Sequence, residues 1–137
     1  MDKPLQSLII ADHLLSTTYP LVKDPKVLLG VLTNLDLTYA WVMKHVVDKD
    51  GLFRSTTFGG RFEQFKHIVE GKLSTGEIES IRIIHELHEE HKKSPVEFVR
   101  KQQLVICSDT YGLKTLSHTS LKEHIRHAKS IVNKLLV

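Results

Sequence analysis

The segment from Val27 to Val47 constrains the fold most strongly, because it is apolar on nearly every side of a helix. Asp24 and Pro25 precede it, and this pair favours a helix start as N-cap and first helical residue. We expect a helix from there to about Asp48. A helix of this kind has to be buried on several sides, so it should form the centre of a bundle, the seam of a homodimer, or both.

A membrane span is the other structure that a long apolar segment could form. Asp36 and Lys44 lie inside the segment, and each charge at the centre of a span costs about 2.5–3.5 kcal/mol. We therefore predict a buried helix and no membrane partner. The chain has one cysteine, Cys107, which excludes an internal disulfide framework and favours a reducing compartment. We expect a cytoplasmic protein.

Helical spacing of apolar residues predicts further helices along the chain. The residue before a proline avoids the helical region, so the first helix should end before Tyr19-Pro20. Ser74 and Glu77 form a capping box before Ile78–His91, and Ser120 and Glu123 form another before the last helix. The expected helices are Pro4–Thr17, Arg61–Gly71, Ile78–His91 continuing to Lys92-Lys93, and Ser120 to nearly Val137.

Between the last two predicted helices the spacing of apolar residues changes from that of a helix to that of a strand. Ser94–Glu97 fits a short helical turn, and Leu104–Cys107 and Leu113–Leu116 fit two strands joined by the turn residues Ser108–Gly112. The predicted fold is mainly α, an antiparallel bundle of about four long helices with a short β-hairpin before the last helix. All 137 residues should form this single domain.

An arginine followed six residues later by a histidine occurs twice, as Arg61/His67 and as Arg82/His88. Arginine can hold a phosphate through its planar fork, and histidine can move protons near neutral pH. Such a pair could activate a ribose 2′-hydroxyl without a metal. The alternative is structural: Arg61 would be a surface residue at a helix start, and Arg82 would pair with Glu79 or Glu86.

This spacing in a helical domain of this length resembles the HEPN superfamily. The resemblance implies a helical bundle that is often dimeric and a metal-independent ribonuclease site at a cleft between protomers. It would make Arg61, His67, Arg82 and His88 the catalytic residues. Six helical residues separate two side chains by about 120°, so convergence needs a kink, a helix end or a second subunit.

Histidines gather on two of the predicted helices. His85, His88 and His91 continue the apolar stripe of Ile78–His91. His124 lies on the last helix, which could pack beside Ile78–His91 and bring His124 close to the other three. These four are candidates for metal ligands, but the sequence has no supporting cysteine pair and no Glu-x-x-His motif, so we predict no metal. The alternative is a set of hydrogen-bonded histidines at a helix interface.

The C-terminal third is basic, with nine Lys and Arg after His91 against three acidic residues. Lys92, Lys93, Arg100 and Lys101 flank Phe98, a combination that can neutralise and stack on a nucleic-acid strand. The alternative places Phe98 in the core. This block also resembles small uncharacterised archaeal proteins, a resemblance that implies a cytoplasmic protein with no known activity.

Two functions remain open from the sequence. The first is a HEPN-like domain that binds RNA or a nucleotide, with possible ribonuclease activity. The second is a non-enzymatic homodimeric scaffold or protein-interaction module, motivated by the excess apolar surface of Val27–Val47. We predict no cofactor, because Gly59-Gly60 stands alone and is not a phosphate-cradling loop.

Overall fold

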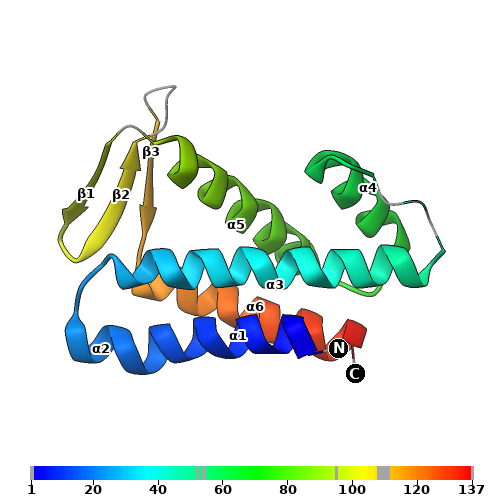
Figure 1. Ribbon diagram of the computed structural model, residues 1–137, viewed down its shortest axis with the longest axis horizontal. Helices are drawn as coiled ribbons and strands as arrows, with labels where there is room; N and C mark the ends of the chain where they lie inside the picture. Colours follow the sequence, from blue (N-terminus) through cyan, green and yellow to red (C-terminus); the bar gives the residue numbers. More distant parts are fainter. Residues whose placement is uncertain (1, 52, 54, 95, 108–111, 137) are drawn as a thin grey trace.

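The computed structural model describes residues 2–51, 53, 55–94, 96–107 and 112–136. This part of the chain is mainly helical, with a small antiparallel sheet before the last helix (Figure 1). In chain order the elements are α1 (Asp2–His13), the π-helix η1 (Leu14–Thr18), α2 (Tyr19–Val22), α3 (Val27–Lys49), α4 (Phe58–Ile68), α5 (Thr75–Lys93), β1 (Val96–Arg100), β2 (Gln103–Cys107), β3 (Leu113–Leu116) and α6 (His118–Leu136).

Helix α3 is central, as its sequence predicts. It contacts α1, α4, α5 and α6, which cover most of its apolar side chains within one chain, although Leu37 stays exposed (Figure 1). The Asp24 side chain accepts a hydrogen bond from the Lys26 backbone N–H just before the helix. The buried side chains of α3 are Leu28, Val31, Leu32, Leu35, Thr38, Tyr39, Val42, Met43 and Val47.

The other helices surround α3 unequally. α1 and α6 pack along α3 and against each other, whereas α4 packs mainly on α3. α5 contacts α3, α6 and β2, and it lies obliquely to α3 in Figure 1. The mainly helical class is therefore confirmed, but a regular four-helix bundle is not.

The first helix does not end before Tyr19-Pro20. It widens into η1, where the Tyr19 N–H bonds to the carbonyl of Leu14, five residues earlier, and continues through α2. Proline lacks an N–H and its ring clashes with the carbonyl four residues before it in a regular α-helix. The wider π turn changes that register, which explains how Pro20 is accommodated. Lys23, at φ +52°, ends the helix.

The helix starts are set by hydroxyl caps. The capping box before α5 is present as predicted, with Ser74 and Glu77 bonded reciprocally. α4 begins at Phe58, because Thr57 accepts a hydrogen bond from the Gly60 N–H, so the predicted start at Arg61 is three residues late. α6 also begins earlier than predicted, where Ser117 accepts from the Ser120 N–H.

The sheet has one strand more than the predicted hairpin. β1 pairs with β2, from Val96 opposite Cys107 to Arg100 opposite Gln103, and β2 pairs with β3. The predicted helical turn at Ser94–Glu97 is wrong: Val96 and Glu97 belong to β1, and Ser94 donates to the Cys107 carbonyl. The predicted turn at Ser108–Gly112 lies largely outside the described residues.

Candidate functional site

The first arginine–histidine pair is divided between the two ends of α4. Arg61 lies in the first turn, where its Nη1 donates to the backbone carbonyls of Ser55 and Thr56, at 3.2 and 3.0 Å. His67 is exposed in the last turn and lines a separate hollow with Glu63 and Lys66. The two side chains therefore belong to different surface features.

The second pair is also divided between different partners. Arg82 Nη2 lies 2.5 Å from Glu79 Oε2, and its Nη1 lies 2.8 Å from Glu86 Oε1. Glu79 and Glu86 flank Arg82 by three and four residues on α5, so this is the ion-pair arrangement that the sequence offered as the structural alternative. Hydrogen bonding to Glu79 and Glu86 raises the Arg82 pKa further above its usual value.

His88 points instead to an acidic residue of α3. Its Nδ1 lies 3.0 Å from Asp36 Oδ2, in ion-pair range but without hydrogen-bond geometry to any described residue. His85 Nδ1 lies 3.3 Å from the other oxygen of Asp36. The Phe58 ring stacks on the His85 imidazole, with centroids 3.5 Å apart. One carboxylate thus joins two histidines at the contact between α3 and α5.

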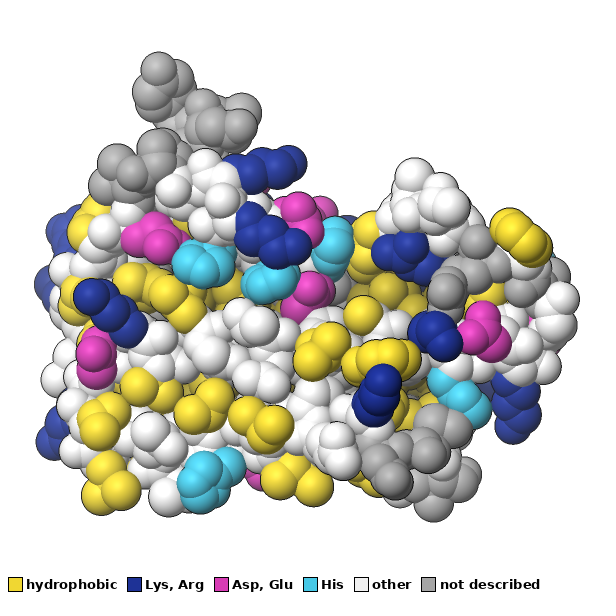
Figure 2. Space-filling view, viewed as in Figure 1, with side chains coloured by type: hydrophobic (Ala, Val, Ile, Leu, Met, Phe, Trp, Pro, Cys, Tyr) yellow, Lys and Arg dark blue, Asp and Glu magenta, His cyan; other side chains and the backbone are white. Residues whose placement is uncertain are grey.

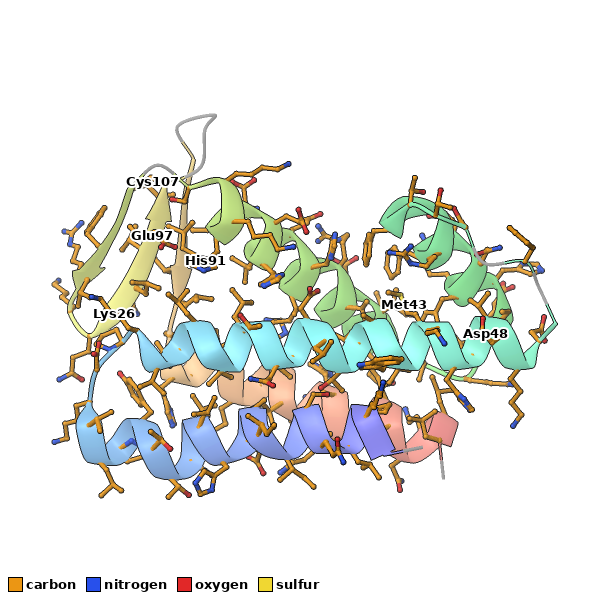
Figure 3. The ribbon with its side chains drawn as sticks, viewed as in Figure 1. Lys26, Met43, Asp48, His91, Glu97 and Cys107 are labelled. Atoms are coloured by element: carbon orange, nitrogen blue, oxygen red, sulfur yellow. The ribbon has the colours of Figure 1, made fainter. Side chains whose placement is uncertain are left out.

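The remaining histidines bond to other elements. His91 Nδ1 lies 2.6 Å from Glu97 Oε2, and Figure 3 shows the two side chains together between α5 and β1. His124 Nδ1 bonds to Ser80 Oγ, which bonds in turn to the buried Tyr39 hydroxyl. Burial and the neighbouring His127 lower the His124 pKa.

Histidine, acidic and basic side chains gather on the surface over α5 in Figure 2. The contacts above make this a row of histidine–carboxylate pairs that ties α5 to α3 and β1. Among the described residues no group of three or more His, Cys, Asp or Glu side chains has the arrangement to hold a metal ion.

The four basic residues predicted to form one surface lie in two pairs, and strand β1 separates the pairs. Lys92 and Lys93 end α5, and Lys92 pairs with Glu89 at 3.2 Å. Arg100 and Lys101 lie at the far end of β1, at an estimated distance of about 13 Å along the strand from Val96. The Phe98 side chain between them is 41% exposed, so it lies outside the core.

A groove at the other end of α3 has a cation-rich, aromatic lining that our sequence analysis missed. Trp41 is at its centre, with Lys3 Nζ 4.4 Å and Lys44 Nζ 5.6 Å from the ring centroid. These are distances at which a cation is attracted to an aromatic face. We call this surface the Trp41 groove, defined by Lys3, Pro4, Gln6, Leu37, Ala40, Trp41, Lys44, His45, Asp48, Lys49 and Arg61.

The Trp41 groove consists of two adjoining hollows. The larger, about 730 Å³, lies between α1 and α3, and the smaller, about 310 Å³, lies between α3 and Arg61 of α4. Figure 2 shows basic side chains around apolar ones on this part of the surface. Asp48 is the acidic member, and its Oδ2 lies 3.4 Å from Lys44 Nζ. Three lysines and an arginine against one carboxylate make the groove electropositive.

The groove has a sequence signal, but a weak one. Trp41 and Lys44 are one helical turn apart, yet a tryptophan in a helix that is apolar nearly all round is expected to be buried.

Comparison with family models, with curated proteins and with solved structures gives no match. Among the described residues no helix has the length and apolar character needed to cross a membrane. Function has to be inferred from the geometry of the chain itself.

Proposed function

We propose that this protein binds RNA or a nucleotide through the Trp41 groove. The observation that supports this most directly is the indole of Trp41 placed within reach of Lys3 and Lys44. A nucleotide offers both complements of such a surface, a flat base that stacks on an aromatic ring and a phosphate that attracts cations. Arg61, first singled out for its spacing to His67, lines this groove.

The resemblance to HEPN domains supports the same class of ligand. Cleavage by Arg61/His67 or Arg82/His88 remains a further prediction, and it makes a structural demand: Arg82 would have to exchange Glu79 and Glu86 for a phosphate. A binding function leaves the Arg82 ion pairs intact and requires only that Lys3 and Lys44 turn from the Trp41 ring toward the ligand. We therefore place binding first and ribonuclease activity second, in a protein that we expect in the cytoplasm.

A homodimeric scaffold is the second candidate, and one surface favours it. Leu5, Ile9 and Ile10 on α1 have exposures of 45, 65 and 48%. Exposed apolar side chains close together on one helix are typical of a protein contact surface. The predicted homodimer would then use α1, because α3 already contacts α1, α4, α5 and α6 of its own chain along most of its length.

The binding proposal is tested with a fluorescently labelled single-stranded RNA and fluorescence anisotropy. Changing Lys3 and Lys44 together to glutamine should weaken binding at least tenfold, because two phosphate contacts are lost. The affinity of the unaltered protein should fall with added salt, and the double variant should have a shallower salt slope.

Two comparison variants make the result specific to the groove. Lys26→Gln removes an exposed lysine at the opposite end of α3, as Figure 3 shows by the positions of Lys26 and Asp48, and should leave the affinity unchanged. Lys92→Gln/Lys93→Gln tests the surface predicted from the sequence. The proposal is wrong if the unaltered protein does not bind, or if only the Lys92/Lys93 variant loses affinity.

A further inference from the structure

Cations approach Trp41 from two sides of α3. Lys3 of α1 and Lys49 line the larger hollow, Arg61 of α4 lines the smaller one, and Trp41 and Lys44 belong to both. Figure 1 shows α1 and α4 on opposite sides of α3. A ligand lying across the indole would therefore meet positive charge in both directions away from the ring.

Arg61 is held in place for such a contact. Its Nη1 is anchored by the carbonyls of Ser55 and Thr56, whereas its Nε and Nη2 donate to no described residue. The guanidinium has five N–H donors, so the remaining ones can form a charge-assisted fork to a phosphate. Anchoring the side chain in advance reduces the entropy lost on binding.

We propose that the Trp41 groove binds an internal nucleotide of a single RNA strand and discriminates against free mononucleotides and duplexes. This inference rests on the proposed function. An internal nucleotide has a phosphate on both the 5′ and the 3′ oxygen of its ribose, and these two phosphates match Lys3 and Lys49 in one hollow and Arg61 in the other. A free mononucleotide has phosphate on one side only, so it leaves one hollow unused.

A duplex is disfavoured for a different reason. The faces of paired bases are stacked on their neighbours and cannot reach an aromatic side chain without being splayed out. An unpaired strand offers those faces at little cost, and base–aromatic stacking tolerates every base. Stacking on Trp41 therefore predicts selection for strandedness and little selection for sequence.

Tryptophan fluorescence measures binding at this site directly, because Trp41 is the one tryptophan in the sequence. Trp41 fluorescence is titrated with a single RNA strand of about eight nucleotides, with ADP, and with a GC-rich RNA duplex of about twelve base pairs. We expect the strand to quench Trp41 and to bind at least tenfold more tightly than ADP or the duplex. The inference is overturned if ADP or the duplex binds as tightly as the strand.

Variants on the two sides separate the contributions of the hollows. Arg61→Gln and Lys49→Gln should each weaken strand binding several-fold, and Arg61→Lys should recover part of the loss. Arg61→Gln should leave ADP affinity nearly unchanged if ADP occupies the larger hollow. Equal loss for strand and ADP in both glutamine variants would contradict the two-sided arrangement.

The two proposals fail in different ways. If neither the strand nor ADP alters Trp41 fluorescence or binds by anisotropy, the proposed function is wrong. If ADP binds at Trp41 and the RNA strand binds no more tightly than ADP, the proposed function stands and only the inference about the strand is wrong. Because Arg61 also holds its loop, the thermal unfolding of Arg61→Gln is measured beside Lys49→Gln, which leaves that loop intact.

Discussion

Glu77 shows how much a single buried side chain contributes to this fold. It is 3% exposed and holds two elements together, accepting from the Ser74 N–H on one side and from Ser130 and Lys134 of α6 on the other. Burial alone would raise the pKa of its carboxyl. The hydrogen bonds from Lys134, Ser130 and Ser74 outweigh burial and lower the pKa to about 2.

Glu77→Gln should therefore reduce stability at neutral pH. The folded pKa lies below the unfolded value of about 4.3, so the ionised carboxylate stabilises the fold above that pH and the effect is lost as pH falls toward 2. We expect a loss on the order of 3 kcal/mol at pH 7, measured by chemical denaturation.

The pH dependence distinguishes this explanation from simple loss of packing. The difference between Glu77→Gln and the unaltered protein should shrink steadily between about pH 5 and pH 2. Glu63→Gln is the matched control, because the Glu63 side chain is 72% exposed beside Lys66 and such surface pairs contribute about 0–1 kcal/mol. If the stability difference between Glu77→Gln and the unaltered protein stays the same in acid, the ionised Glu77 carboxylate is not its cause.

At the scale of elements, the α1–η1–α2 segment shows how a helix accommodates proline. The π turn before Pro20 lets the helix continue, and Lys23 ends it in the left-handed region at φ +52°. Glycine is the residue that adopts this conformation without steric cost. The chain thus retains strain at Lys23 that a glycine would remove.

Lys23→Gly is expected to stabilise the protein by about 0.5–1 kcal/mol, measured as an increase in thermal and chemical stability. Lys122→Gly is the comparison, since Lys122 is exposed inside α6 and glycine in a helix interior should destabilise by about the same amount. If both variants shift stability in the same direction, the strain at Lys23 is not the cause.

For the whole molecule, the exposed apolar surface of α1 predicts association with a second copy. If the predicted homodimer forms through the α1 surface of Leu5, Ile9 and Ile10, Ile9→Glu should abolish association and leave a folded monomer whose melting temperature no longer depends on protein concentration. Ile9 is 65% exposed, so the charge is tolerated in the monomer. Sedimentation velocity over a concentration series measures this.

The control for association is Asn133→Glu, an equally acidic change at an exposed position on α6. It should leave the association state unaltered. An unaltered protein that sediments as a monomer at every concentration removes the scaffold candidate and leaves the Trp41 groove unaffected.

The sequence by itself determined the features that depend on near neighbours. The Ser74–Glu77 capping box and the central position of α3 were expected from residue spacing, and the pairing of Arg82 with Glu79 or Glu86 was the structural alternative to its catalytic role. These follow from the sequence because a helix brings residues three or four apart together and because an apolar surface has to be covered.

The tertiary structure alone decided which distant residues meet and which side chains stay open. Asp36 bridges His85 and His88 across about fifty residues of chain, and β1 became a strand because β2 offered an edge to pair with. Trp41 remained accessible because α1 and α4 flank α3 without closing over it. Such outcomes depend on where whole helices pack, and local spacing contains no information about that.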